Sequence, residues 1–229
     1  MDEKKIRKSL SGFYEELLKT CRESGRKTQE IEVIFATKYI KASQLASFIK
    51  IYDEMFGKKV SVGENRVQDA ERKFSQLEDR DPLIGDKYRG VMIGNLQKNK
   101  INKALLVFDE LHAIDSVKLA EEVEKRADRI IPVYFEVNVS GEKSKQGISA
   151  EESKEAIEAV RKMKKLSLKG LMTMAPYAAD PETVRPYFRK LRNLADEYRL
   201  KTSMGMSGDF RQAIEEGSDV LRIGTRIFG

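Results

Sequence analysis

A lysine follows a short apolar run in the first quarter of the chain. Residues 31–37 read Ile-Glu-Val-Ile-Phe-Ala-Thr, and Lys38 comes directly after them. A short run rich in β-branched and aromatic residues is typical of a strand that is buried on both faces of a parallel sheet. A lysine whose amine loses its proton can attack an aldehyde and form an imine, so Lys38 is a candidate for carbonyl chemistry. The alternative is that Lys38 extends its ammonium group from the strand end into water.

Two short loops near the end of the chain contain residues suited to an anion. One loop holds Ser207 and Gly208, and the other holds Gly224 and Thr225, and each follows a short apolar segment. Backbone N–H groups at the start of a helix can bind phosphate, a serine hydroxyl can donate a further hydrogen bond, and glycine lets the ligand approach the backbone closely. Glycine and serine are also common in ordinary turns. The two loops together predict a phosphate site.

Three more residues are candidates for ligand contacts. Arg222 lies two residues before Gly224 and therefore on the same face of a strand, where it offers a fixed cation or takes part in a structural ion pair. Asn65 could orient a polar ligand atom, although asparagine is also a routine helix cap. Met204, like Met206, is more typical of barrel filling.

These groups together favour pyridoxal 5′-phosphate as the ligand. Its aldehyde would meet Lys38, its phosphate the loops of Ser207 and Thr225, and its ring nitrogen Arg222. An arginine at that position keeps the pyridine nitrogen unprotonated, which weakens the ring as an electron sink. The single histidine, His112, lies in the middle of a predicted strand, so we expect a core residue and not an acid or base.

Eight apolar segments alternate with helical patterns along the chain. This alternation predicts a closed parallel (β/α)8 TIM barrel with an extra N-terminal helix, and a doubly wound open sheet is the alternative. No linker divides the chain, so we expect a single domain over 1–229. The expected strands are 31–37, 60–63, 88–94, 107–114, 131–139, 168–175, 202–206 and 219–224. The expected helices are 3–24, 41–56, 67–78, 96–105, 117–128, 149–164, 180–199 and 210–216. In such barrels the active site lies at the carboxyl ends of the strands.

The composition excludes several classes of protein. The 43 basic and 37 acidic residues give a net charge of +6 that is spread along the helices, which argues against nucleic-acid binding. One cysteine, Cys21, allows no internal disulfide, and no Cys/His cluster suggests a metal site. No stretch is apolar enough to span a membrane. We therefore expect a cytoplasmic protein.

Eight short motifs are distributed along the chain: Ala36–Lys38, Gly63–Arg66, Ile93–Lys100, Asn138–Gly147, Gly170–Thr173, Arg185–Phe188, Ser203–Asp209 and Arg222–Gly229. With these motifs in this order, the chain resembles, over essentially its whole length, the YggS/PROSC family of pyridoxal phosphate homeostasis proteins. The resemblance implies that Lys38 is the cofactor lysine, that Ser207, Gly208, Gly224 and Thr225 form the phosphate site, and that Arg222 faces the pyridine nitrogen. It also places Asn65 and Met204 in the pocket wall.

Lys145 and Asn95 lie within these motifs. Lys145 matches a second lysine of the family, in a Ser-Lys-x-Gly loop that would act in cofactor uptake or transfer, and a solvated loop lysine is the alternative. Asn95 stands where the family usually has histidine. Because asparagine does not titrate near neutral pH, any proton role of that position is lost here.

The resemblance also implies a function. The barrel is similar to the N-terminal domain of alanine racemase, whose further β-rich domain and dimer partner complete the active site. Because this chain ends four residues after Thr225, we expect no such domain, an open barrel mouth and a monomer. The implied role is cofactor buffering and delivery, with transient contacts to apoenzymes that require pyridoxal phosphate and no robust turnover. A weak racemase or transaminase, or a phosphate-binding barrel without pyridoxal chemistry, are the alternatives.

Overall fold

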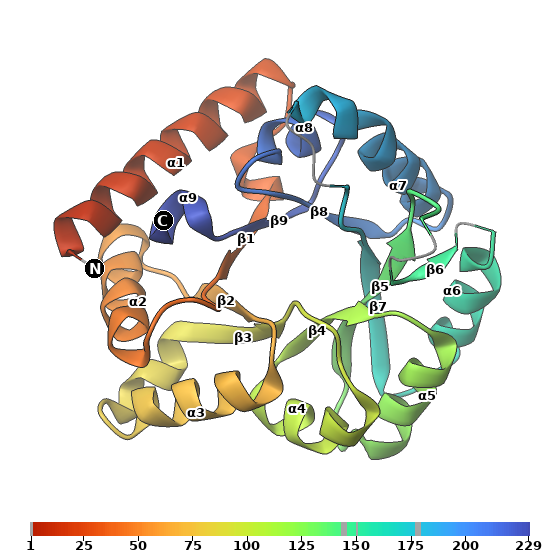
Figure 1. The fold of residues 1–229 in the computed structure, drawn as a ribbon, viewed down its shortest axis with the longest axis horizontal. Coiled ribbons are helices and arrows are strands. Elements are labelled where there is room, and N and C mark those ends of the chain that lie inside the picture. Colours follow the sequence, from red (N-terminus) through yellow and green to blue (C-terminus); the bar gives the residue numbers. More distant parts are fainter. Residues whose placement is uncertain (1, 143–145, 150, 177–179) are drawn as a thin grey trace.

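The computed structural model describes residues 2–142, 146–149, 151–176 and 180–229. Eight parallel strands pair in the order β1-β2-β3-β4-β5-β7-β8-β9, and pairing of β1 with β9 closes the barrel (Figure 1). The predicted (β/α)8 barrel is therefore confirmed. The strands are β1 (Glu32–Ala36), β2 (Val60–Glu64), β3 (Tyr88–Met92), β4 (Glu110–Ile114), β5 (Ile131–Asn138), β6 (Ile148–Ser149), β7 (Leu166–Met172), β8 (Lys201–Met206) and β9 (Val220–Ile223).

Helices surround the barrel on its outer face (Figure 1). Their apolar stripes pack on the strands and form one large core cluster between the helices and the sheet. The helices are α1 (Glu3–Glu23), α2 (Ala42–Phe56), α3 (Val67–Glu78), α4 (Ile101–Val107), α5 (Val117–Arg126), α6 (Ser153–Arg161), α7 (Arg185–Glu197), α8 (Phe210–Glu215) and α9 (Thr225–Phe228). No helix among the described residues is long and apolar enough to cross a membrane.

The expected extra N-terminal helix is α1. Asp2 caps it, since its carboxylate accepts a hydrogen bond from the Lys4 N–H at 3.1 Å. Its buried side chains, which include Leu10 and Phe13, face the core. The helix packs against α2, α8 and α9, so it joins the two ends of the barrel sequence on one side of the molecule (Figure 1).

The helix expected over 149–164 begins later, at Ser153. The capping-box hydrogen bonds do form, because Ser149 Oγ accepts from the Glu152 N–H at 3.2 Å and Glu152 Oε2 accepts from the Ser149 N–H at 3.1 Å. They close a turn and not the helix itself, since Ser149 is held in the short strand β6, where it pairs with Asn138 of β5. The sequence pattern did not predict this extra strand.

Two other helices also start later than expected. Asp180 caps a 3₁₀ turn, Pro181–Val184, and α7 follows it. Pro186 lacks the N–H that it would need in the interior of a helix starting at Pro181, but proline is tolerated in the first turn of α7. The helix expected over 96–105 starts at Ile101, after a 3₁₀ turn at Lys98–Lys100 that adds no apolar side chain to the core. The final helix, α9, was not predicted.

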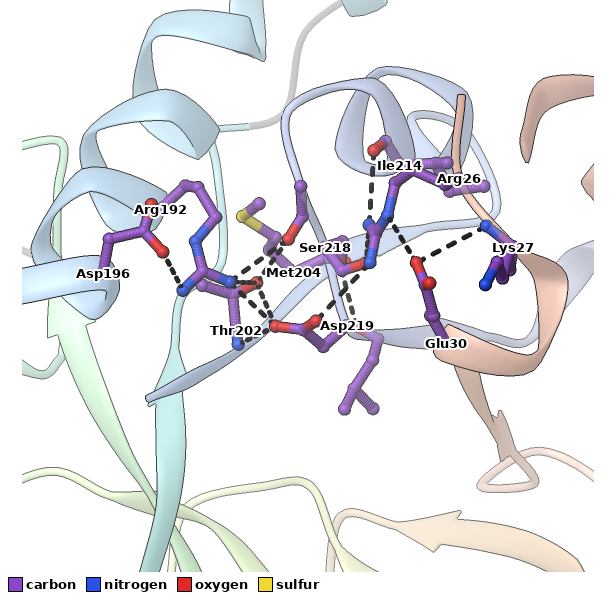
Figure 2. A network of polar contacts seen from close by, with 12 residues as sticks. Arg26, Lys27, Glu30, Arg192, Asp196, Thr202, Met204, Ile214, Ser218 and Asp219 are labelled. Atoms are coloured by element: carbon purple, nitrogen blue, oxygen red, sulfur yellow. Dashed lines mark hydrogen bonds and ion pairs between the residues drawn. The ribbon is translucent and has the colours of Figure 1, made fainter. Parts of the chain in front are cut away.

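A polar network joins the amino ends of the last two strands (Figure 2). The Asp219 carboxylate accepts hydrogen bonds from Arg192, at 2.8 Å, and from the N–H of Thr202, also at 2.8 Å. Arg26, which follows α1, donates to the same carboxylate at 3.5 Å. The network therefore connects α1, α7, β8 and β9 at the end of the barrel opposite to the predicted site.

Candidate functional site

A cavity of about 440 Å³ lies at the carboxyl ends of β1 and β9. Because parallel strands all point the same way, the loops that follow them meet at this edge of the barrel. Six of the eight predicted site residues line the cavity: Lys38, Ser207, Gly208, Arg222, Gly224 and Thr225. The lining also includes Ala36, Tyr39, Pro176, Met206 and Asp209.

Lys38 follows β1, and its side chain is exposed. The Nζ atom lies 4.8 Å from the centre of the Tyr39 ring, which is a cation–π distance. The lysine is therefore not buried in the strand end, and the Tyr39 ring, which is 81% exposed, is its neighbour at the cavity edge. An exposed amine can be reached by a ligand that enters from solvent.

A buried ion pair holds the backbone directly before Lys38. Lys73 of α3 donates to the carbonyl oxygen of Thr37 at 2.8 Å and to the carboxylate of Glu64. The Thr37 hydroxyl donates to the same carboxylate at 2.7 Å. Lys73 and Glu64 are 7% and 1% exposed, so the strand end is fixed by charges that are almost completely removed from water.

Sequence reasoning missed Lys73, although a signal was present. Ala70, Lys73, Phe74 and Leu77 follow helical spacing and form the buried stripe of α3. A lysine within such a stripe requires a buried acceptor, because an unpaired ammonium is costly away from water. The acceptor itself, Glu64, could be identified only from the tertiary structure.

Arg222 lies inside the barrel and is 5% exposed. Its Nη1 donates to Ser203 Oγ at 2.7 Å, and its Nη2 donates to the carbonyl oxygen of Thr173 at 2.8 Å. Burial lowers the pKa of Arg222 to about 10, against the opposing effect of the Glu136 and Asp209 carboxylates. The guanidinium is therefore charged at neutral pH and supplies a cation to the cavity wall.

The two predicted phosphate loops are joined by one side chain. Ser207 Oγ accepts hydrogen bonds from the backbone N–H groups of Gly224, at 3.1 Å, and Arg226, at 3.2 Å. Both N–H groups are thereby used, and Ser207 Oγ accepts twice, so the Ser207 hydroxyl proton is left to donate to a ligand. A Cβ added to Gly208 would meet no protein atom within 4 Å, so this glycine borders open space. A hydroxyl donor held by two loops, beside free space, fits a phosphate group.

Asp209 lines the same cavity and was not among the predicted site residues. Its Oδ1 accepts a hydrogen bond from the Met206 N–H at 2.6 Å, and it precedes α8. Burial raises the pKa of the Asp209 carboxyl, and the charge of Arg222 opposes this shift. An aspartate that follows Ser-Gly before a helix is typical of a helix cap, which concealed its position at the site.

The other predicted site residues lie elsewhere. Asn65 lines a neighbouring cavity of about 310 Å³ that also borders Lys38. Met204 is 0% exposed and packs in the core between barrel and helices, so its ligand contact stays a prediction. Met206 was expected to fill the barrel, and this was wrong, since it is 37% exposed at the cavity wall.

Asn95 is not among the residues that line the Lys38 cavity. Asn95 is exposed and borders a separate hollow next to Asn65, so its side chain lies away from Arg222 and Ser207. Lys145 is outside the described residues. Within the described ranges, no group of three or more His, Cys, Asp or Glu side chains is placed to hold a metal ion.

Known proteins are similar to this chain in sequence and in fold. Residues 87–229 match the family model of the alanine racemase N-terminal domain. The pyridoxal phosphate homeostasis protein of Aquifex aeolicus is 38% identical, and the match covers 96% of each chain.

Two solved structures superpose over almost the whole barrel. A protein of unknown function from Bifidobacterium adolescentis is 29% identical with a TM-score of 0.89, and the match covers 100% of this chain and 97% of that one. PipY of Synechococcus elongatus, solved with pyridoxal phosphate bound, is 26% identical with a TM-score of 0.81, covering 98% and 100%. With its closed barrel and these relatives, the chain belongs to the family of pyridoxal phosphate homeostasis proteins.

Proposed function

We propose that the protein binds pyridoxal 5′-phosphate in the Lys38 cavity and acts in intracellular pyridoxal phosphate homeostasis. The observation that carries the proposal is the meeting of three groups around one cavity: the amine of Lys38, the guanidinium of Arg222 and the hydroxyl of Ser207. The relatives named for this role, and the PipY structure with the cofactor bound, support it.

Each group has a chemical role. When bound, pyridoxal phosphate supplies an aldehyde, with which a free lysine amine condenses with loss of water. Lys38 provides that amine at the cavity edge. The Ser207 hydroxyl, whose oxygen is held by the N–H groups of Gly224 and Arg226, would donate to the phosphate, and Arg222 would hold a hydrogen-bond donor against the ring nitrogen. Thr225 and Gly208 border the same space, the first with a hydroxyl and the second with an open backbone.

We propose storage and delivery of the cofactor, with release to enzymes that require it. The exposed Lys38 supports this role, because a carrier must let its ligand leave. A second candidate function, weak racemase or transaminase activity, rests on the alanine racemase N-terminal domain fold. It is tested by incubating the loaded protein with an amino acid in deuterated water, since a racemase introduces deuterium at the α-carbon and a carrier does not.

The primary experiment is trapping of the bound cofactor. The purified protein is mixed with pyridoxal phosphate, its absorption spectrum is recorded, and borohydride reduction is followed by peptide mapping. We expect a visible band and a label on Lys38. Lys38→Arg should lose both while keeping the charge, and the control Lys41→Arg, at a neighbouring exposed lysine, should keep both. No band, or label spread over many surface lysines, would reject the proposal.

The single domain over 1–229, the monomeric state and the cytoplasmic location stay predictions. Light scattering of the protein as it elutes from a size-exclusion column tests the oligomeric state directly. Contacts with recipient apoenzymes are tested by mixing the loaded protein with a pyridoxal-phosphate-dependent apoenzyme and following recovery of that enzyme's activity. Recovery faster than with an equal concentration of free cofactor supports direct delivery.

A further inference from the structure

A line of polar side chains crosses the interior of the barrel below the cavity. The interior also holds an apolar cluster that includes Ile34, Val91 and Met172. The polar line runs from Arg222 through Ser203 and His112 to Glu110, and all four residues are at most 5% exposed. Buried polar groups are tolerated when they are fully hydrogen-bonded, so the line needs a consistent set of donors and acceptors.

The hydrogen bonds run in one direction along this line. Arg222 Nη1 can only donate, so Ser203 Oγ accepts at 2.7 Å. The Ser203 proton is then free for His112 Nδ1 at 3.1 Å. The other ring nitrogen, Nε2, lies 2.6 Å from Glu110 Oε1 and donates to that carboxylate. This assignment requires neutral His112 with its proton on Nε2.

Two further contacts support the neutral form of His112. The ring is 0% exposed and stacks on Tyr134, with centroids 4.0 Å apart and planes 25° apart. Burial lowers the pKa of His112, although Glu110 opposes the shift. The carboxylate of Glu110 is balanced by Arg89, whose Nη1 lies 2.9 Å from Glu110 Oε2. Arg89 also pairs with Glu32, so it is shared by two carboxylates, but it gives Glu110 a cationic partner other than the histidine.

The line ends at the guanidinium that borders the cavity. Arg222 has five N–H donors, and two are used in bonds to Ser203 and to the Thr173 carbonyl. These two bonds set the plane of the guanidinium and decide which edge faces the cavity. Replacing His112 by an apolar side chain would leave the Ser203 hydroxyl and the Glu110 carboxylate without this partner.

We propose that His112 is a positioning residue for the cofactor site. As an acceptor it fixes the Ser203 hydroxyl, and the Ser203 oxygen in turn holds the Arg222 guanidinium in the orientation that presents its remaining donors to the cavity. The proposal rests on the proposed function, since the group that Arg222 addresses is the ring of pyridoxal phosphate.

The test compares Ser203→Ala and His112→Phe with wild type. We expect each variant to shift the visible absorption band of the bound cofactor and to weaken its binding by about five- to tenfold, the effect of one or two displaced hydrogen bonds. Because both changes break the same chain of hydrogen bonds, their effects should not add. The double variant should bind pyridoxal phosphate no more than about twofold more weakly than the single variant that binds it less tightly. The control Tyr134→Phe keeps the ring stacked on His112 and removes only a hydroxyl, so its spectrum and affinity should equal those of wild type.

A second measurement keeps the inference separate from the proposed function. Nuclear magnetic resonance of the cofactor-free protein reports rotation of the Arg222 guanidinium, whose signal is assigned by its loss in Arg222→Lys. Rotation should be slow in wild type and fast in Ser203→Ala. Wild type that takes up no pyridoxal phosphate would reject the proposed function alone. Slow rotation in Ser203→Ala, or folded variants with wild-type spectrum and affinity, would overturn the positioning role. Should His112→Phe fail to fold, Ser203→Ala decides.

Discussion

The ammonium of Lys73 is paired with the carboxylate of Glu64 directly beneath the backbone that carries Lys38. The pair joins α3 to the end of β2, and through Thr37 it also holds the end of β1. Both charges are buried, so each requires the other. The position of Lys38 thus depends on the ion pair of Lys73 and Glu64, although neither residue contains the reactive amine.

Replacing Lys73 should therefore affect both stability and cofactor attachment. Lys73→Met leaves the Glu64 carboxylate buried and unpaired, so we expect a loss of about 3–5 kcal/mol in the free energy of unfolding. We also expect slower trapping of pyridoxal phosphate on Lys38, since Thr37 loses a hydrogen bond. Urea unfolding and borohydride labelling measure the two effects.

A matched control is Lys103→Met, because Lys103 pairs with Glu71 on the surface, where its side chain is 47% exposed. Exposed pairs contribute about 1 kcal/mol or less, so this variant should unfold almost as wild type does. Equal losses in Lys73→Met and Lys103→Met would show that the buried pair has no special role.

The Asp209 carboxylate should oppose phosphate binding as it ionises. Burial raises the pKa of Asp209, so it stays neutral to a higher pH than an ordinary aspartate and becomes an anion beside the predicted phosphate site above that pH. We expect Asp209→Asn to bind inorganic phosphate up to about tenfold more tightly at neutral pH, which is the effect of one partly screened charge. Calorimetric titration measures this affinity.

The pH dependence gives the sharper test of Asp209. Phosphate itself titrates near neutral pH, but this contribution is the same for both proteins and cancels in their ratio. The affinity advantage of Asp209→Asn should grow as pH rises through the folded pKa of Asp209 and vanish below it. Asp69→Asn, which alters a carboxylate of a neighbouring cavity, serves as control. If the ratio of the phosphate affinities of Asp209→Asn and wild type does not change with pH, the Asp209 carboxylate does not oppose phosphate binding.

The Asp219 network should stabilise the fold without affecting the cofactor site. It lies at the amino ends of β8 and β9, the end of a barrel that serves stability and not chemistry (Figure 2). Asp219→Ala removes acceptors from Arg192 and Thr202, so we expect a loss of about 2–4 kcal/mol, because hydrogen bonds to charged groups contribute about 1.5–3 kcal/mol each and the side chain is 22% exposed. Affinity for pyridoxal phosphate should not change.

The control for Asp219 uses the same arginine. Asp196 also pairs with Arg192, at 2.8 Å, but its side chain is 65% exposed (Figure 2). Asp196→Ala should therefore cost at most about 1 kcal/mol. If Asp219→Ala and Asp196→Ala were equally stable, the half-buried Asp219 carboxylate would not be the centre of the network.

The sequence predicted the barrel well because strand and helix patterns are local. Each of its eight strands was expected from a short apolar run, and the loops of Ser207 and Gly224 were found from their place after such runs. The contacts that the sequence could not predict depend on closure of the barrel. Ser203 and His112 come from β8 and β4, which lie on different sides of the barrel, and only the folded interior brings them to 3.1 Å.

Contacts within the polar line also depend on the folded sheet. His112 was correctly expected in the core, and strand alternation places Glu110, two residues earlier, on the same face. No local pattern indicated that the Glu110 carboxylate accepts a hydrogen bond from the ring. The ion pair of Lys73 and Glu64 also requires the register of β1 on β2, in which Ala36 lies beside Gly63. Pairings of this kind follow from the sheet and not from either segment alone.

The pH dependence of stability should report the protonation state of His112. Burial lowers its pKa below the ordinary value of 6.5, and the charged groups that face it are Glu110, Glu32 and Arg222. The unfolded chain therefore takes up a proton at a higher pH than the folded protein does. The stability that neutral His112 contributes is fully present above pH 6.5 and is lost as pH falls below it, by up to about 1.4 kcal/mol per pH unit.

His112→Phe isolates this contribution, because His112 is the only histidine of the chain. The free energy of unfolding is measured in urea from pH 8 down to pH 5, a range of about three units around the ordinary histidine pKa. We expect the stability gap between wild type and His112→Phe to narrow as the pH falls. A charged His112 paired with Glu110 would have a raised pKa, and the gap would then widen on acidification. The direction of this change therefore decides whether His112 accepts the Ser203 proton, on which the orientation of Arg222 depends.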